Sequence, residues 1–299
     1  MLSKELQSTI ISNIQEFCHN VRKQIPEEAL EFISSEGYVR SQADYYESVM
    51  RDLGMDTKHK LILEIGTGFG FFMAYAIKVL NWDMCGIEPG KDKFGRFEIA
   101  KAIFDYNGID KERLVNSSGE RIKFESNNFD IVISNDVLEH VENPRTVILE
   151  ALRVLKPGGI AIFNFNNYRW IYEAHYNLLW FPFMSKPLAK KYVAWRKRDS
   201  GYIDHLNFLN PTYIKKIIKN IPNARVCLPL EYKTADFMIQ RVKAYTQCME
   251  VEKRKQMFLP FFKILIDICS MKLFKQVMQI FASLTGIYHE MHLVLMKDR

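Results

Sequence analysis

A glycine-rich turn between a strand and a helix constrains this chain more than any other feature. Residues 61–65 form a short apolar run, as expected for a buried parallel strand, and residues 71–80 are apolar over a helical length. Between them, Gly66, Gly68 and Gly70 alternate with other residues. Glycine tolerates positive φ and lets a ligand lie against the backbone, and a helix N-terminus favours an anionic group. The sequence therefore predicts a ligand-binding turn after a buried strand.

The spacing of these glycines separates two kinds of nucleotide-binding turn. In the dinucleotide-binding fingerprint, the third glycine follows the first by five residues, and here that position is Phe71. The observed spacing is Glu-x-Gly-x-Gly-x-Gly, from Glu64 to Gly70. It resembles the first motif of class I S-adenosylmethionine (SAM) dependent methyltransferases.

Further segments resemble the other motifs of that family in the expected order. Residues 83–88 read as a second strand that ends in an acid, Glu88. Residues 117–130 resemble the adenine-contacting segment, and residues 131–141 and 153–159 are close to the family consensus. The resemblance covers roughly residues 60 to 165, and it implies SAM as methyl donor and S-adenosylhomocysteine as product.

The resemblance also implies which residues bind the cofactor. The acid at the end of the second strand, Glu88, would accept hydrogen bonds from the ribose hydroxyls. The family often has Asp where this chain has Ser118, so this chain departs from the pattern there. Arg40 could pair with the methionine carboxylate or be a surface arginine. The full set implied by the resemblance is Glu64, Gly66, Thr67, Gly68, Gly70, Glu88, Ser118, Gly119, Glu120, Asn135, Asp136 and Arg40.

The fold class follows from the alternation of strand and helix patterns between residues 61 and 165. This alternation predicts an α/β fold with a doubly wound, mostly parallel sheet, seven-stranded and Rossmann-like in the family, with ligands at the carboxyl ends of the strands. The expected organisation is a helical N-terminal leader at 1–56, a SAM-binding core at 57–229 with a cap insertion at 164–210, a helical insertion at 230–287, and a final antiparallel strand at the sheet edge within 288–299.

The leader contains amphipathic helical patterns. Residues 3–23 place Ile10, Ile14, Phe17 and Val21 at helical spacing. That face could pack on its own domain, pair with another chain or lie on a membrane. Two further helices are expected in 27–53, separated around Gly37.

The expected cap is rich in aromatic residues and contains a basic run. Residues 186–198 carry six basic residues and no acid, which favours either a solvated helix face or recognition of a phosphate or other anion. Residues 230–287 are expected to form a cap or a homodimer contact. An interfacial helix that touches a membrane surface is the alternative.

Composition bounds the location and the partners. The 299 residues are 48% hydrophobic with a net charge of +6, which fits a globular protein and mildly favours an anionic partner. The five cysteines show no metal-binding spacing, so we expect reduced thiols and no metal site. The N-terminus lacks a signal peptide pattern, and no apolar stretch reaches the roughly 20 residues of a transmembrane helix. We expect a cytoplasmic protein.

Two histidines of the expected cap are candidates for a general base. His175 lies beside Glu173, and His205 follows Asp204. A hydroxyl acceptor gains from such a base near neutral pH, with the neighbouring carboxylate as its orienting partner. His140 belongs to the family consensus Leu-Glu-His-Val, and we interpret it as a cofactor-side or structural residue.

Three functions remain open from the sequence. The first is transfer of a methyl group to a small-molecule acceptor, most readily an oxygen of a sugar, nucleotide-linked or lipid-linked intermediate, because residues 172–192 loosely resemble methyltransferases of bacterial surface-glycan synthesis. The second is an RNA or protein methyltransferase, which the basic run suggests. However, the chain has no Asn/Asp-Pro-Pro-Tyr motif and no nucleic-acid module, so nucleic acid is not expected. The third is a non-catalytic SAM-fold partner protein, against which the intact glycine motif and Glu88 argue.

Overall fold

A single seven-stranded sheet organises the computed structural model, which describes residues 2–232, 236 and 272–299. The strand order is β3-β2-β1-β4-β5-β9-β8. The strands are β1 (Leu61–Ile65), β2 (Asp83–Glu88), β3 (Leu114–Asn116), β4 (Phe129–Asn135), β5 (Leu155–Asn166), β8 (Ala224–Val226) and β9 (Glu290–Lys297). The α/β fold with a mostly parallel seven-stranded sheet, predicted from the sequence, is confirmed.

One strand runs against the others. The pairs β1–β2, β1–β4, β2–β3 and β4–β5 are parallel, whereas β9 is antiparallel to both β5 and β8. The final strand is therefore antiparallel as expected. Its expected place at the sheet edge is wrong, because β9 lies between β5 and β8 and β8 forms the edge.

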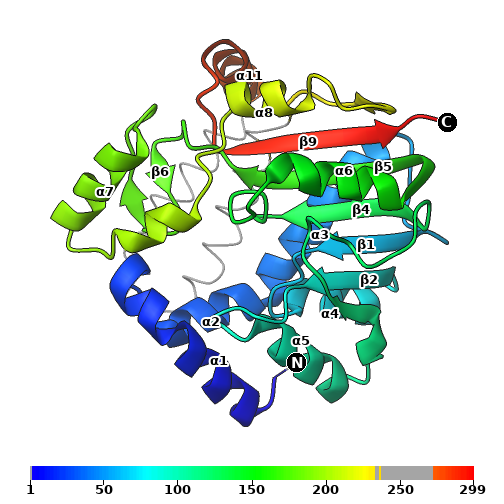
Figure 1. The fold of residues 1–299 in the computed structure, drawn as a ribbon, viewed down its shortest axis with the longest axis horizontal. Helices are drawn as coiled ribbons and strands as arrows, with labels where there is room; N and C mark the ends of the chain where they lie inside the picture. Colours follow the sequence, from blue (N-terminus) through cyan, green and yellow to red (C-terminus); the bar gives the residue numbers. More distant parts are fainter. Residues whose placement is uncertain (1, 233–235, 237–271) are drawn as a thin grey trace.

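Helices cover both faces of the sheet, as Figure 1 shows. Alternate strand residues point to opposite faces, so Ile62 packs into one apolar cluster and Leu63 into the other. The first cluster contains side chains of α3 (Glu36–Asp52), α4 (Phe71–Lys78) and α5 (Arg96–Tyr106). The second contains side chains of α6 (Pro144–Val154), α8 (Pro211–Ile218) and α11 (Lys272–Thr285). This arrangement is the doubly wound architecture.

The leader consists of three α-helices and one π-helical turn. These are α1 (Lys4–Phe17), the π-turn η1 (Cys18–Arg22), α2 (Pro26–Ser34) and α3. The break between the last two helices lies at Ser35, where the side-chain hydroxyl caps α3 by accepting from Tyr38 N. The expected break at Gly37 is wrong because Gly37 lies within α3.

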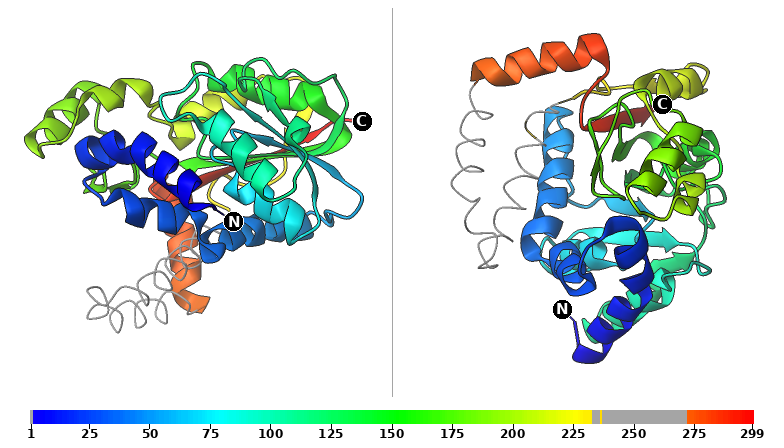
Figure 2. Two further views of the ribbon diagram at one scale, coloured as in Figure 1. Left: turned by 90° about the horizontal axis from the view of Figure 1, so that it is seen from below. Right: turned by 90° about the vertical axis from the view of Figure 1, so that its left-hand side faces the viewer.

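The leader packs against the core of its own chain (Figure 2). Ile10 and Ile14 of α1 are buried in the first apolar cluster. Asn13 Nδ2 donates a hydrogen bond of 2.8 Å to Phe94 O, in the loop after β2. Of the three interpretations of the amphipathic face, packing on its own domain is the one that the structure has.

Residues 167–210 form a small unit beside the leader (Figure 1). The unit contains a two-stranded sheet, β6 (Tyr172–Glu173) and β7 (Leu178–Leu179), the helix α7 (Lys186–Trp195) and a short 3-10 helix, η3 (Gly201–His205). Its side chains form a third apolar cluster, which Val21 of η1 joins. The leader and this unit are therefore held together by shared packing.

Most of the expected helical insertion at 230–287 lies outside the described residues. The part that is described, α11, is helical, and it leads into β9 through residues 286–289. Within the described ranges, no helix combines the length and apolar character that crossing a bilayer requires.

The packing of α1 on the core can be tested by shortening one of its buried side chains. Ile10 is 0% exposed, and replacing a buried isoleucine by alanine costs about 2–5 kcal/mol. We expect Ile10→Ala to lower the free energy of unfolding by this amount in urea titrations. The matched control is Ile25→Ala, since Ile25 is 53% exposed and should change little. Equal stability of both variants would contradict the packing of α1 on the core.

Candidate active site

The carboxyl ends of the parallel strands lie side by side along one border of the sheet. We call this border the carboxyl edge, which is distinct from the edge strand β8. Ile65 is in register with Ile87 on one side and with Ser134 on the other. The residues that follow these three therefore lie together, and they include Gly66, Glu88 and Asn135. In Figure 1 this edge faces the leader and the unit that contains α7.

Each glycine of the turn has a left-handed backbone, but the space beside the three glycines differs. The φ values of Gly66, Gly68 and Gly70 are 77°, 60° and 83°. A Cβ on Gly66 would lie 2.3 Å from Val137 Cγ2, and one on Gly70 would lie 2.9 Å from Phe104 Cε1. A Cβ on Gly68 would meet no atom within 4 Å. The outer two glycines serve packing, whereas Gly68 faces open space that a ligand can approach.

Glu88 closes the turn from the neighbouring strand. Its carboxylate is buried, and Oε2 accepts a hydrogen bond of 2.8 Å from Gly68 N. Burial raises its pKa, against the opposing influence of Arg96, whose Nη1 lies 3.8 Å from Glu88 Oε1, and of the Gly68 hydrogen bond. The acid predicted to follow the second strand is therefore buried beside the glycine turn.

Glu64 is a second buried carboxyl group at the same edge. Burial, followed by repulsion from Glu88, raises the pKa of Glu64 to about 8, although a hydrogen bond with Thr67 opposes the shift. Glu64 Oε2 has no hydrogen-bond partner among the described residues. Glu64 therefore keeps its proton at neutral pH, and a nearby cation would favour its ionised form.

The remaining residues expected to bind the cofactor stand in different surroundings. Asn135 Nδ2 donates to Asp136 Oδ2 at 2.8 Å, and Asp136 has a left-handed φ of 53°. Glu120 Oε1 accepts from Glu142 N at 2.9 Å, so Glu120 supports the loop before α6. Ser118 and Gly119 lie in the loop after β3, Ser118 partly exposed and Gly119 buried.

Arg40 is engaged elsewhere. Its guanidinium contacts Asp44 Oδ1 at 2.8 Å and Glu47 Oε2 at 3.6 Å, both on the same helix. The hydrogen bond with Asp44 is the main cause of its raised pKa. Arg40 is absent from the lining of the cavity described next, so its proposed contact with the methionine carboxylate finds no support in the geometry.

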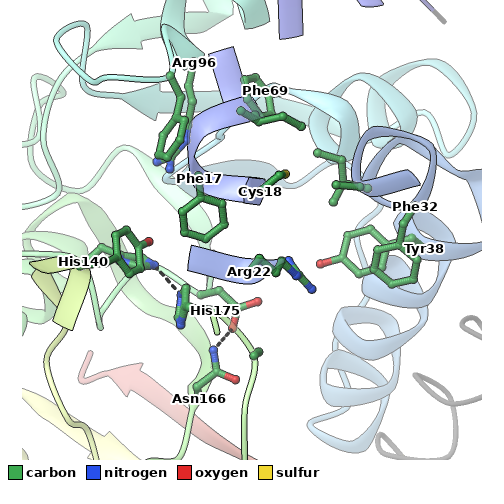
Figure 3. Close-up of a pocket in the computed structure, with 17 residues that line it drawn as sticks. Phe17, Cys18, Arg22, Phe32, Tyr38, Phe69, Arg96, His140, Asn166 and His175 are labelled. Carbon is green, nitrogen blue, oxygen red and sulfur yellow. Dashed lines mark hydrogen bonds between the residues drawn. The ribbon is translucent and has the colours of Figure 1, made fainter. Parts of the chain in front are cut away.

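A cavity of about 280 Å³ lies between the leader and the carboxyl edge of the sheet (Figure 3). Its leader wall is largely apolar and includes Phe17 and Phe32, but it also carries Arg22 of η1. The opposite end is polar. The polar residues that line that end are Asp136, His140, Asn166 and His175.

His175 is held from one side by a carboxylate and faces a second imidazole on the other. Its Nδ1 lies 2.7 Å from Glu173 Oε1, and its Nε2 lies 3.2 Å from His140 Nε2. Burial alone would lower the pKa of His175, but attraction to Glu173 and their hydrogen bond outweigh burial, so the pKa is raised. For the His140 ring, desolvation and then the charge of His175 hold the pKa well below its usual value.

Glu139 lies next to the two imidazoles, with a carboxylate oxygen within 4.8 Å of a ring nitrogen of each. It is 0% exposed, its Oε1 accepts from Asn166 Nδ2 at 2.9 Å, and its Oε2 has no partner among the described residues. Burial and then repulsion from Asp136 raise the pKa of Glu139 to about 7. The carboxyl groups of Glu139 and Glu173 thus lie beside the two imidazoles that line the polar end of the cavity.

The second candidate base is placed differently. His205 is exposed and is absent from the cavity lining. Asp204, its expected orienting partner, forms an ion pair of 2.7 Å with Lys190. The arrangement expected for His175 and Glu173 is present, whereas Asp204 is held by α7 and does not orient His205.

Sequence reasoning missed several residues of this site. Asn166 ends β5, and a polar residue at a strand end was a signal that could have been used. Glu139 and His140 were seen only as consensus, because their contact with His175 joins positions that are 35 residues apart. Arg96 follows β2 closely, but nothing in the sequence indicated that it would approach Glu88.

Comparisons with known proteins agree with this geometry. Residues 63–163 match the family model described as a methyltransferase domain. This match identifies residues 63–163, about a third of the chain, as a methyltransferase domain. An uncharacterized methyltransferase of Mycobacterium sp. (strain JLS) is 30% identical over 106 residues, which are 36% of this chain and 38% of that protein. The chain thus spans well under half the length of the curated relatives it matches.

Solved structures share the fold of the chain over most of its length. A structure assigned as a sarcosine dimethylglycine methyltransferase from Galdieria sulphuraria has a TM-score of 0.53 at 12% identity, covering 86% of each chain. The [4+2]-cyclase SpnF has a TM-score of 0.52 at 12% identity, covering 98% of this chain and 95% of its own. At such identities the likeness establishes the fold and no substrate.

The residues at the carboxyl edge fit a SAM molecule. SAM carries positive charge on its sulfonium and ammonium groups, and Glu64 and Glu88 are buried carboxyl groups without a buried lysine or arginine among the described residues. Gly68 leaves open space beside the backbone. Both features suit a cationic nucleoside that lies against the turn.

The buried carboxyl of Glu64 should make stability fall as pH rises. In the unfolded chain this group titrates near 4.5 and in the fold near 8. Between these values the folded state holds a proton that the unfolded state has lost, so raising the pH favours unfolding. We therefore expect Glu64→Gln to gain stability relative to wild type between pH 5 and pH 8, as measured by urea unfolding. The control for loss of charge is Glu98→Gln, because Glu98 is exposed. If the stability difference between Glu64→Gln and wild type is the same at pH 5 and at pH 8, the raised pKa does not belong to Glu64.

Proposed function

We propose that this chain is an active SAM-dependent methyltransferase whose acceptor is a small molecule bound in the cavity under the leader. The observation that supports this most is the contact between cavity and cofactor turn. Phe69, inside the glycine motif, and Asp136, at the end of β4, both line the cavity. A methyl donor at the turn would therefore lie next to whatever fills the cavity.

The cofactor would lie along the carboxyl ends of β1, β2 and β4. In this proposal Gly66, Gly68 and Gly70 form the turn under the cofactor, and Glu88 receives the ribose hydroxyls in place of, or together with, its bond to Gly68 N. Ser118 to Glu120 lie on the adenine side, and Asn135 and Asp136 lie between cofactor and acceptor. Arg40 has no role in this arrangement.

The cavity indicates the general character of the acceptor. Its volume of about 280 Å³ is near the lower limit of small-molecule sites, roughly 300–1,000 Å³. The apolar leader wall suits a hydrocarbon or ring, and Arg22 suits an anionic group on the acceptor. The relatives described above give no support for a surface-glycan acceptor. A sugar, nucleotide-linked or lipid-linked compound is one class of molecule that could have both an apolar part and an anionic group.

Residues 167–210 carry the acceptor contacts from the other side. Ala174, His175 and Tyr202 line the cavity, and they belong to the unit packed against the leader. SAM supplies a reactive methyl group on sulfur, so the main task of the protein is to align acceptor and donor and to exclude water. An acceptor hydroxyl must also lose its proton. His175, oriented by Glu173, is the better placed of the two expected bases because His205 lies outside the cavity.

Two other functions are weaker. An RNA or protein substrate would need an open surface, whereas the polar groups here lie inside a cavity, and Lys190 of the basic run is occupied by Asp204. A partner protein without methyl transfer has one argument in its favour, because the cyclase SpnF shares the fold. The clustered acid and base groups beside an intact glycine turn favour catalysis.

Binding of SAM at the turn can be tested at Gly68. A methyl group there would project into open space at a φ of 60°, where a bound cofactor would approach the backbone. We expect Gly68→Ala to weaken SAM binding at least tenfold in titration calorimetry. No heat from wild-type protein would refute the proposed cofactor site.

The matched control for Gly68→Ala is Gly108→Ala. Gly108 has a φ of 63° and nothing within 4 Å of an added Cβ, but it follows α5, away from the turn. Both variants should lose about 1–2 kcal/mol of stability through the left-handed backbone. Only the first should lose affinity for SAM. Equal affinity in the two variants would place the cofactor elsewhere.

The acceptor and the role of His175 can be tested together. Incubation with methyl-labelled SAM and separate fractions of metabolites, RNA and protein identifies the class of acceptor. We expect label in a metabolite. With that acceptor, His175→Ala should lower turnover by about 10²–10⁴ while SAM affinity stays near wild type. His205→Ala should keep wild-type turnover, and a large loss in this variant instead would reverse the assignment.

A further inference from the structure

Three potential metal ligands converge at the polar end of the cavity. One ligand atom each from Glu139, His140 and His175 lies within 4.8 Å of the others. Two features of the contacts within this group bear on metal binding. Both imidazoles present Nε2 to each other at 3.2 Å, and Glu139 Oε2 is buried without a partner among the described residues.

The hydrogen bonds around the cluster fix which atoms point inward. Glu173 accepts from Nδ1–H of His175, so the neutral ring has its lone pair on Nε2, the atom that faces His140. Asn166 donates to Glu139 Oε1 and leaves Oε2 as the remaining acceptor. A carboxylate behind a histidine and an amide behind a carboxylate are the outer contacts that usually orient metal ligands.

The spacing of the two nitrogens suits a shared cation. Nitrogen ligands at about 2.0–2.1 Å from one ion are about 3–3.4 Å from each other when the angle at the ion is 90–109°. The separation of 3.2 Å falls within that range. Ligand atoms on opposite sides of one ion are at most about 4.4 Å apart. Atoms that are spread over up to 4.8 Å would therefore have to move closer together when an ion binds.

We propose that Glu139, His140 and His175 bind one divalent transition-metal ion at the polar end of the cavity. Two imidazoles and one carboxylate suit first-row ions such as Mn²⁺, Fe²⁺, Co²⁺ or Zn²⁺, whereas Mg²⁺ and Ca²⁺ prefer sites made of oxygen atoms. Asp136 adds a second carboxylate beside the cluster, because Asn166 Nδ2 lies 3.4 Å from Asp136 Oδ1 and 2.9 Å from Glu139 Oε1. A cation would offset the repulsion between these two carboxylates.

The ion would change how the acceptor is activated, and this consequence rests on the proposed function. His140 and His175 both line the cavity, so the open positions of the ion would face the acceptor. A hydroxyl bound to a divalent cation loses its proton at lower pH than a free one. The Nε2 lone pair of His175 serves either as ligand or as proton acceptor. With an ion bound, His175 is a ligand that Glu173 positions.

Metal binding is tested on the full chain after removal of any affinity tag and treatment with a chelator. Titration calorimetry with Zn²⁺ and Mn²⁺ should give one site per chain. Co²⁺ should produce visible absorption bands that Zn²⁺ abolishes. We expect Glu139→Gln and His175→Ala to weaken binding at least tenfold, while His205→Ala, which changes an exposed histidine outside the cluster, binds as wild type. No binding by wild-type protein, or equal binding by all variants, would overturn the proposal.

Two further measurements separate this proposal from loss of fold and from the proposed function. Glu139→Gln keeps the shape of the side chain, and calorimetry with SAM reports whether the variant is still folded. Retained SAM binding with lost metal binding supports the site. If wild-type protein binds SAM but takes up no Zn²⁺, Mn²⁺ or Co²⁺, the metal site is refuted and the methyltransferase proposal stands. If the protein takes up metal but does not bind SAM, the metal site is supported and the methyltransferase proposal is refuted.

Discussion

The burial of carboxyl groups at one edge of the sheet is the constraint on which the rest of the site depends. Glu64, Glu88, Glu139, Glu173 and Glu290 are buried there, and no lysine or arginine is buried among the residues that the structure describes. Such charges are costly unless donors or cations meet them. Glu88 accepts from the backbone of the turn, and Glu173 keeps a lowered pKa because attraction to His175 outweighs its burial. Glu64 and Glu139 have raised pKa values. Binding of a cationic ligand at this edge would therefore also stabilise the fold.

The cavity exists because two segments outside the core sheet pack against each other. The leader contributes α1 and η1, and the unit at residues 167–210 contributes its own apolar cluster, with Val21 shared between them. Neither segment belongs to the matched domain at 63–163. The glycine turn thus lies inside the matched domain, whereas the cavity walls from the leader and from residues 167–210 lie outside it.

The sequence predicted the core well and the outer segments less well. The glycine spacing and the apolar runs determine β1, β2 and the fold class, because a buried parallel strand and a tight turn leave few alternatives. The boundary at Gly37 was wrong because Ser35, two residues earlier, caps α3 by accepting from the free N–H of Tyr38. The pairing of Arg40 with Asp44 follows from helical i, i+4 spacing, a local rule that competes with any distant ligand. The contact between His140 and His175 could not be predicted, since it depends on how the chain after β5 folds back.

The π-turn at Cys18–Arg22 has a consequence for how such cavities diverge. A π-turn winds one residue more into a turn than an α-helix does, and here it brings both Cys18 and Arg22 to the cavity wall. Loss of a single residue from this segment would restore α-helical winding and rotate Arg22 by about 100° relative to α1. The charge of Arg22 would then leave the cavity wall, while Arg96 would still line the cavity. A one-residue deletion in this turn would therefore change the charge of the cavity wall as substitution of Arg22 itself would.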